Sequence, residues 1–473
     1  MIRIFHDFFN ELRAEDITFC HWKGHHQVNE NLDGEGDLDI FTPLVSKKKF
    51  EEIANEGGFK KVLSYQAEHP FIEHFYGFDV DTLKFVHLHV YFKIVTGEHI
   101  SKNYILPLEN YLARNLDFNL LLPTINENAK LNIFLIRYFL KIGSLFGLIQ
   151  YFREREKYSN EWSSMGHTSN DDIIDLNLSN EILQEMKTTY LSSSPLGKLT
   201  LSLRIKKRLK KFRRKPFFSH QLFNIRNISF RLLNKLFFRK KKLLDPGLLI
   251  AICGLDGSGK SSLVLELKKS FSKDFSVKVF HLGRPSSSLL TIFFNFPIRI
   301  YSAIRRINPK RDKKNMIAET KRTSNLQAFR SLLLAYDRSR ASSRARKYSQ
   351  SGYLVVCDRY PGILQGKMDS PRIILDKDRG SFYQFCYEKE KQLYDSIQPA
   401  KAIFHLSVPL NTSIERNNNR FKFGKETEEE LRQRFALNED ARFLAEEYNL
   451  IDATLPFREV TAQVSQSIWN LRI

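Results

Sequence analysis

The chain has 473 residues, 42% of them hydrophobic, which is enough for two or three domains with sizeable cores. Its formal net charge of +21 favours an anionic partner. The four cysteines are widely spaced and form no CxxC pair. That spacing argues against a disulfide framework or a thiolate zinc site, and it fits a protein of the reducing cytoplasm.

The N-terminal segment, residues 1–16, alternates apolar and charged residues and lacks the apolar core of a signal peptide. The most apolar segment is Leu131–Phe152, but Arg137 and Lys141 interrupt it. We therefore expect a buried helix pair there rather than a membrane span. These features predict a cytoplasmic protein, with peripheral attachment to the inner face of the membrane left open.

Residues 1–120 mix short helix and strand patterns and are expected to form a small α+β domain. Apolar or alternating runs at 37–44 and 84–95 predict two strands. The amphipathic segment Lys47–Glu56 predicts a helix between them.

The first of these strands carries an acidic pair. Asp37 and Asp39 are two residues apart, so both carboxylates lie on one strand face, where they could share a divalent metal. The segment Phe19–Pro43, a glycine-containing stretch followed by D-x-D on a strand, resembles the nucleotidyltransferase superfamily. The resemblance implies a third carboxylate from a later strand, where this sequence has His87 and His89. Metal ligation and a polar role on a half-buried strand are both open for these histidines.

Residues 121–245 read mainly as helices. Between Leu201 and Lys242 the chain has 16 basic residues and no acidic one. Two basic amphipathic helices are expected in this stretch, at 203–215 and 222–242. Their apolar stripes consist of Ile205, Leu209 and Phe212 in the first helix, and of Ile225, Ile228, Leu232 and Leu236 in the second.

Three interpretations of this basic stretch remain open. In the simplest, it is a helical linker whose apolar stripes pack on the flanking domains while its basic side faces solvent. An anionic membrane surface or the acidic face of a partner protein is the second. Nucleic acid is the weakest, because the stretch contains no defined nucleic-acid-binding motif. Assembly as a homodimer is also left open.

From residue 246 to residue 473 the pattern changes to strands alternating with helices, which is typical of a doubly wound parallel α/β sheet. The apolar runs that predict the strands are Leu248–Cys253, Val277–Phe280, Tyr353–Cys357, Ala402–Ser407 and Asn449–Ile451.

A phosphate-binding loop follows the first of these strands. Residues 254–261 fit the pattern G-x-x-x-x-G-K-[ST], with a buried strand before them and an apolar-periodic helix after them. In such a loop, backbone N–H groups surround the phosphates, Lys260 reaches the β- and γ-phosphates, and the Ser261 hydroxyl binds Mg²⁺. The residues expected to bind ATP are Gly254, Leu255, Asp256, Gly257, Ser258, Gly259, Lys260, Ser261 and Ser262.

The residues around the loop limit the classes of reaction that the protein could catalyse. The acidic Asp256 lies inside the loop, Asp358 and Arg359 follow a second buried strand, and 402–435 ends in a segment dense in arginine. Together these features resemble the thymidylate kinase family, over Leu248–Ile473.

The resemblance assigns a role to each matching residue. It implies that Asp256 organises the acceptor sugar and a neighbouring arginine. Asp358 and Arg359 would lie near the acceptor phosphate and the magnesium. The remaining matches are arginines: Arg284 and Arg338 would bind the acceptor, and the lid residues Arg416 and Arg420 would close over the transferred phosphoryl group.

These features predict an ATP- and Mg²⁺-dependent phosphotransferase that acts on a nucleoside monophosphate or a related small phosphorylated acceptor. The segment Pro361–Ile373 departs from the family pattern, so the resemblance does not identify the acceptor. Two alternatives stay open. One is an NTP-binding regulatory or scaffold protein, and the other is a nucleotidyltransferase acting through the N-terminal domain.

Overall fold

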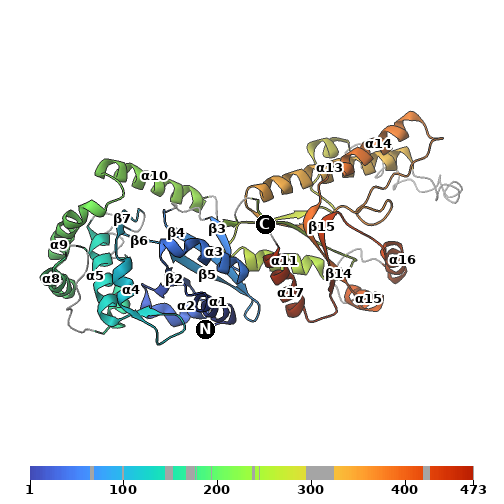
Figure 1. The fold of residues 1–473 in the computed structure, drawn as a ribbon. Coiled ribbons are helices and arrows are strands. Elements are labelled where there is room, and N and C mark those ends of the chain that lie inside the picture. The colour runs from blue at the N-terminus through green and yellow to red at the C-terminus, as the bar shows by residue number, and fades with distance from the viewer. Residues whose placement is uncertain are drawn as a thin grey trace. The chain divides into compact units, whose positions relative to one another are not determined.

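The chain forms two compact units, Met1–Lys241 and Lys242–Ile473 (Figure 1). The first unit contains both the predicted α+β domain, 1–120, and most of the predicted helical region, 121–245. The computed structural model describes residues 1–63, 69–98, 101–143, 153–166, 176, 178–192, 194–236, 240–243, 246–294, 324–418 and 427–471.

The first unit is built on a mixed sheet with the strand order β3–β4–β5–β2–β1–β9–β8. Strands β2 and β5 are parallel, whereas β4 runs antiparallel to β5. The strands of the unit are β1 Cys20–His21, β2 Asp37–Phe41, β3 Lys60–Leu63, β4 Ile72–Asp79, β5 Lys84–Tyr91, β8 Leu116–Asp117 and β9 Thr124–Ile125, with the separate pair β6 Ile94–Thr96 and β7 Tyr104–Leu106.

Helices cover this sheet. The predicted helix Lys47–Glu56 is confirmed as α3 with the same bounds. The helices of the unit are α1 Arg3–Ala14, α2 Val28–Leu32, α3 Lys47–Glu56, α4 Glu109–Arg114, α5 Glu127–Ile142, α7 Arg155–Ser163, α8 Asn180–Leu191, α9 Pro195–Arg208 and α10 Phe217–Leu236.

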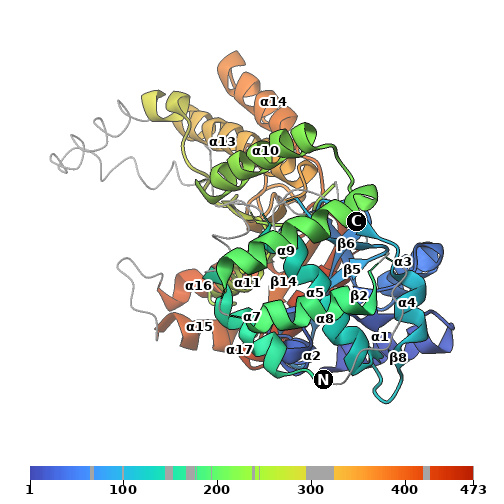
Figure 2. The same cartoon turned by 90° about the vertical axis from the view of Figure 1, so that its left-hand side faces the viewer.

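The described residues of the first unit include two apolar cores. Leu38 and Leu88 point from the sheet into a core with Phe5 of α1 and Phe50 of α3. Helices α5, α8 and α9 pack side by side (Figure 2) and share a second core with strand residues such as Tyr91. The helical region is therefore continuous with the core of the α+β part, a relationship that helical periodicity does not reveal.

The predicted helix pair at 131–152 is described only in its first half. Helix α5 buries most of its side chains, as expected for this segment. Residues 144–152 lie outside the described part of the chain. In the portion that is described, no helix is both long and apolar enough to span a bilayer.

The second unit contains the predicted parallel sheet. All five strands are parallel, in the order β12–β13–β11–β14–β15. Each predicted apolar run corresponds to one strand: β11 Leu249–Gly254, β12 Val277–His281, β13 Leu354–Asp358, β14 Ala400–Ser407 and β15 Ala445–Asp452. The helices are α11 Lys260–Phe271, α13 Asn325–Gln350, α14 Ser381–Asp395, α15 Leu410–Asn418, α16 Glu428–Asn438 and α17 Phe457–Asn470.

The strand order positions the site. Strand β11 pairs with β13 on one side and with β14 on the other, so the chain order reverses across β11. Ligands of open α/β sheets bind at such a switch point, beyond the carboxyl ends of the strands. The predicted loop 254–262 follows β11 at that edge. The four cysteines are all buried and free.

Candidate functional site

The loop between β11 and α11 has the backbone that the motif requires. Gly257 and Gly259 have φ angles of 84° and 90°, in the left-handed region that favours glycine. A Cβ on Gly257 would lie 2.7 Å from Ser413 Oγ and 2.9 Å from the Ser413 carbonyl oxygen. Helix α11 begins at Lys260, so its free N–H groups and positive dipole end lie at the loop. This arrangement can hold an anionic phosphate.

The Lys260 side chain contacts other residues of its own loop. Its ammonium lies 3.0 Å from the Leu255 carbonyl oxygen and 3.1 Å from Asp256 Oδ1. Burial and the nearby Arg359 guanidinium lower the pKa of Lys260, and Asp256 acts in the opposite direction. A phosphate entering the loop therefore competes with the Asp256 carboxylate for this lysine.

Asp256 is the shared counter-ion of three cationic side chains. One of them is Lys260. The Oδ1 atom of Asp256 also lies 2.8 Å from Arg359 Nη2, and its Oδ2 atom forms an ion pair with Arg434 Nη1. Burial alone would raise the pKa of Asp256, but Lys260 and Arg359 outweigh it and lower the pKa to about 2. The carboxylate is thus ionised at any physiological pH.

Sequence reasoning missed Arg434, which comes from α16. The surrounding segment was recognised as rich in arginine, yet nothing in its local pattern separates Arg434 from its neighbours. Its contact joins residues 178 positions apart.

The backbone conformation of Arg359 and its neighbours fix the orientation of its side chain. It has a φ angle of 69°, which is uncommon for a residue with a side chain. A Cβ on Gly283 would lie only 2.2 Å from Arg359 Cδ, so the arginine packs directly on the glycine backbone. Its Nη1 atom lies 3.3 Å from Asp369 Oδ2. Asp369 is a second site residue that the sequence did not reveal.

Arg338 lies behind Asp369 instead of facing an open pocket. The residue is fully buried, and its Nη2 atom lies 3.1 Å from Asp369 Oδ1. It also donates to the carbonyl oxygens of Leu282, at 2.8 Å, and Gly283, at 2.9 Å. This geometry differs from the predicted contact with an acceptor. It favours a positioning role, in which Arg338 fixes Asp369 and Asp369 fixes Arg359.

Asp358 ends β13 directly beside the loop, as its sequence position indicated. The Ser261 hydroxyl donates to Asp358 Oδ2 at 3.3 Å. The Oδ1 atom of Asp358 is buried without a hydrogen-bond partner among the described residues. A carboxylate oxygen with free lone pairs beside a hydroxyl is the type of oxygen ligand set that Mg²⁺ prefers. The two residues present at this position therefore fit the predicted cation.

Among the described residues, neither Arg284 nor Arg416 has a hydrogen bond or ion pair with this cluster. Arg284 is exposed just beyond β12. Arg416 of α15 donates to the Ala453 carbonyl oxygen at 3.0 Å, so it currently supports the loop after β15. Arg420 falls outside the described residues. Lid roles for Arg416 and Arg420, and an acceptor contact for Arg284, stay predictions.

The second predicted site lies on the sheet of the first unit. Asp37 pairs in register with His87, and Asp39 with His89, so the four side chains share one sheet face. The Nδ1 atoms of His87 and His89 lie 2.5 Å from Asp37 Oδ1 and 2.8 Å from Asp39 Oδ1, respectively. The pairing of each carboxylate with an imidazole was not predicted.

The same face carries further polar groups. Lys23 Nζ lies 2.9 Å from Asp39 Oδ1 and donates to the Tyr91 hydroxyl at 2.8 Å. His74 Nδ1 lies 2.9 Å from His87 Nε2. Within the described ranges, no three histidine, cysteine or acidic side chains converge as a metal site would require. Metal binding by Asp37 and Asp39 therefore stays a prediction.

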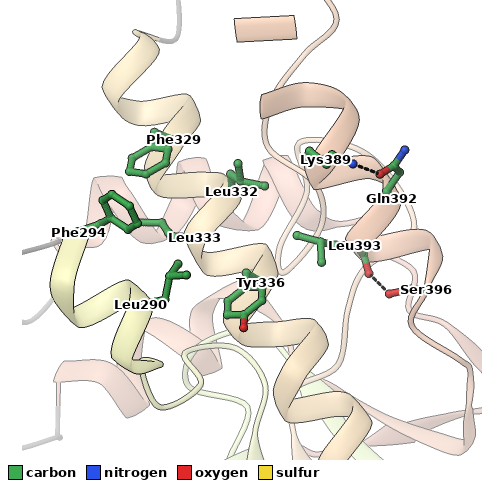
Figure 3. Close-up of a pocket in the computed structure, with 10 residues that line it drawn as sticks. All are labelled: Leu290, Phe294, Phe329, Leu332, Leu333, Tyr336, Lys389, Gln392, Leu393 and Ser396. Atoms are coloured by element: carbon green, nitrogen blue, oxygen red, sulfur yellow. Dashed lines mark hydrogen bonds between the residues drawn. The ribbon is translucent and has the colours of Figure 1, made fainter. Parts of the chain in front are cut away.

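An apolar cavity of about 450 Å³ lies elsewhere in the second unit (Figure 3). Helices α13 and α14, which run side by side, form two of its walls, and the helical residues 289–294 form a third. Phe294 and Phe329 meet edge to face at 5.3 Å, and Lys389 donates to Gln392 at the rim. None of the predicted site residues that the structure describes lines this cavity.

Comparison with known proteins places the chain near nucleotide-binding proteins. No protein-family model matches it. It is similar to the uncharacterized ATP-binding protein YghR of Escherichia coli, from strain K12 and from the O6:H1 strain CFT073. In both cases 227 residues align at 26% identity, covering 47% of this chain and 87% of the relative.

Two solved structures are also similar. One is a deoxyadenosine kinase from M. mycoides with bound dATP, at 14% identity and a TM-score of 0.25, covering 46% of this chain and 97% of that one. The other is the protein APE1195, at 13% identity and a TM-score of 0.24, covering 48% and 96%. Both likenesses are distant.

Proposed function

We propose that this protein is an ATP- and Mg²⁺-dependent phosphotransferase that resembles thymidylate kinase and acts on a nucleoside monophosphate or a related small phosphorylated acceptor. The observation that carries the proposal is the meeting of Asp256, Asp358 and Arg359 around the 254–261 loop, at the switch point of a parallel sheet. The similarity to a relative described as ATP-binding supports the nucleotide part of the proposal.

Each residue has a chemical task in this reaction. The loop N–H groups and the start of α11 bind the ATP phosphates, and Lys260 exchanges its contact with Asp256 for one with the β- and γ-phosphates. Ser261 and Asp358 would hold the Mg²⁺ ion, which when bound supplies positive charge to the phosphate oxygens. Arg359, fixed by Asp256 and Asp369, would orient the acceptor phosphate.

The chemical step needs no covalent intermediate on the protein. An oxygen of the acceptor phosphate attacks the γ-phosphorus in line, while the bond from that phosphorus to the β,γ-bridging oxygen breaks and ADP leaves. Orientation and electrostatic stabilisation supply the catalysis. Water has to be excluded so that ATP is not hydrolysed, which is the task that the resemblance gives to Arg416 and Arg420.

The test is acceptor-dependent ADP formation by the purified full chain. With ATP and Mg²⁺, a panel of nucleoside monophosphates should include at least one that yields ADP together with its own diphosphate. Lys260→Ala should abolish this turnover, and Lys268→Ala, which changes an exposed lysine on the same helix, should leave it intact. Absence of turnover with every acceptor, while Lys260→Ala leaves ATP affinity unchanged, would exclude the kinase.

The same assay separates the alternatives. Tight ATP binding without transfer to any acceptor would favour the regulatory or scaffold protein. Pyrophosphate release that survives Lys260→Ala but is lost in Asp37→Ala would instead favour nucleotidyl transfer by the first unit. That second function would draw on Asp37 and Asp39 and their shared sheet face.

A further inference from the structure

Helix α10 has its polar face inside and its apolar face outside. His220, Asn224 and Asn227 follow the i, i+4, i+7 spacing of one helix face, and their exposed fractions are 4%, 4% and 3%. The apolar residues on the opposite side are much more exposed: Leu222 by 70%, Ile225 by 62%, Leu232 by 60%, Leu233 by 48% and Leu236 by 71%. We call these five residues the leucine face.

Polar contacts of His220 and Asn224 inside the first unit fix this orientation, whereas Asn227 Nδ2 is buried without a hydrogen-bond partner among the described residues. His220 Nε2 lies 2.7 Å from Ser101 Oγ, and Asn224 Nδ2 lies 3.5 Å from Glu98 Oε2. Lys206 of α9 binds the same glutamate at 3.1 Å. Rolling α10 to bury its leucine face would break these contacts and leave buried polar groups unpaired, which is costly. The fold therefore directs the leucine face outwards.

The two basic helices differ from each other in how they bury their apolar stripes. In α9 and the turn after it, Ile205 and Leu209 have 0% exposure, as a packed linker helix requires. In α10 the predicted stripe residues Ile225, Leu232 and Leu236 are exposed instead. The linker interpretation, in which both stripes pack on flanking domains, holds for the first helix only.

Exposed basic residues lie on α10 and in the segment that precedes it. Arg226 of α10 is exposed, and so are Lys207, Arg208, Lys210 and Lys211, which precede the helix in the chain. The stretch 201–242 contains no acidic residue to neutralise them. An apolar helix face in a strongly cationic segment is the composition of helices that lie in the surface of anionic membranes.

We propose that α10 binds an anionic lipid bilayer, with the leucine face inserted among the acyl chains and the basic residues on the lipid headgroups. An acidic protein surface would match the positive charges but would leave the leucine face without an apolar partner. An apolar protein surface would match the leucines but would leave the charges unpaired. An anionic bilayer offers both partners within about 10 Å of depth.

The experiment is co-sedimentation of the full chain with vesicles. Vesicles of phosphatidylcholine containing about 30% phosphatidylserine should pull the protein down, and pure phosphatidylcholine vesicles should do so much less. The double variant Ile225→Gln/Leu232→Gln should weaken partitioning by about tenfold or more, because two inserted apolar side chains are lost. Higher salt should also weaken it, because the headgroup contacts are screened.

The matched control is Leu196→Gln/Leu203→Gln on α9, where the leucines are 74% and 52% exposed but lie outside the leucine face. This variant should bind vesicles like the unchanged protein, and circular dichroism should show that both variants are folded. Failure of the unchanged protein to bind anionic vesicles would overturn the proposal. So would equal binding by both variants, or a dimer in analytical ultracentrifugation that only the α10 variant dissociates, since that would place a second copy on the leucine face.

Discussion

The Asp256 carboxylate and the Arg359 guanidinium form an ion pair with 2.8 Å between Oδ1 and Nη2, although 103 residues separate them in the chain. This ion pair links the phosphate-binding loop to the end of β13. The loop lysine and an arginine from α16 bind the same carboxylate. Changes at Asp256 should therefore affect nucleotide binding and acceptor orientation in opposite directions.

Asp256→Asn should separate these two effects. Removing a negative charge beside Lys260 leaves the ammonium free for phosphate, so ATP should bind about three- to tenfold more tightly. Arg359 loses a partner, so kcat should fall by about tenfold or more. Calorimetric titration with ATP and steady-state kinetics give the two quantities. Weaker ATP binding with an unchanged kcat would contradict the proposed competition for Lys260.

Gly283→Ala should displace Arg359 without touching the phosphate loop. The added Cβ would lie 2.2 Å from Arg359 Cδ, a distance that forces the arginine to move. We expect kcat to fall by about tenfold, because a misplaced catalytic group loses its orientation. ATP affinity should not rise, because Asp256 keeps its charge and its contact with Lys260. Gly380→Ala is the control, since a Cβ there meets nothing within 4 Å. Equal kcat values for both variants would show that the position of Arg359 is unimportant.

Arg338→Lys should destabilise the protein rather than weaken acceptor binding. Lysine cannot reproduce the forked contacts to Asp369 and to the Leu282 and Gly283 carbonyl groups, so a buried carboxylate loses a partner. The expected loss of unfolding free energy is about 3 kcal/mol or more, measured by chemical denaturation. Arg340→Lys, at an exposed position of the same helix, should change little. A stable Arg338→Lys protein with a raised KM for the acceptor would instead support the family role.

Asp358→Asn should raise the Mg²⁺ concentration needed for activity. The change removes the ionised oxygen beside Ser261, and a neutral amide is a poorer ligand for this cation. Half-maximal activity should require about tenfold more Mg²⁺, whereas ATP binding measured without the metal should be nearly unchanged. The exposed Asp378→Asn serves as the control. An unaltered Mg²⁺ dependence would remove Asp358 from the predicted metal site.

The first unit should lose stability as the pH falls from about 6.5 to 4. Burial lowers the pKa of His21 to about 4, whereas an exposed histidine titrates near 6.5, so in this window the unfolded chain binds a proton that the folded chain does not. The slope should approach about 1.4 kcal/mol per pH unit for one such group.

Tryptophan fluorescence can report this change selectively. In Trp469→Phe the remaining tryptophans, Trp22 and Trp162, both lie in the first unit. Denaturation of this variant at several pH values gives the slope, and adding His21→Phe should lower it by about the share of one histidine, because burial also lowers the pKa of His74 and His89. A slope that does not depend on residue 21 would assign the acid sensitivity to other groups.

The sequence pattern predicted local features well. The strands of the second unit, the helix at Lys47–Glu56 and the phosphate-binding loop follow from hydrophobic periodicity and from glycine conformations, which are properties of neighbouring residues. Arg434, which binds Asp256, and Asp369, which binds Arg359, could not be predicted in the same way. Arg434 and Asp369 reach the site by tertiary packing, and a contact 178 residues apart leaves no periodic signal.

Helix α10 shows a second limit of periodicity. Its apolar stripe can be read from the spacing of Ile225, Leu232 and Leu236, but the side that faces the core cannot. Polar residues are buried at lower cost when partners are available, and Ser101 and Glu98 provide them for His220 and Asn224. Which face is inside depends on these distant partners and not on the helix itself.

The loop at Gly257 touches Ser413, whose hydroxyl donates to the Asp256 carbonyl oxygen, while Arg434 of α16 binds the Asp256 side chain. The conformation of the loop is therefore coupled to the positions of helices α15 and α16. An anion that draws Lys260 away from Asp256 alters the strength with which Asp256 retains Arg434. By thermodynamic reciprocity, whatever shifts α16 must alter the loop's affinity for that anion by the same factor.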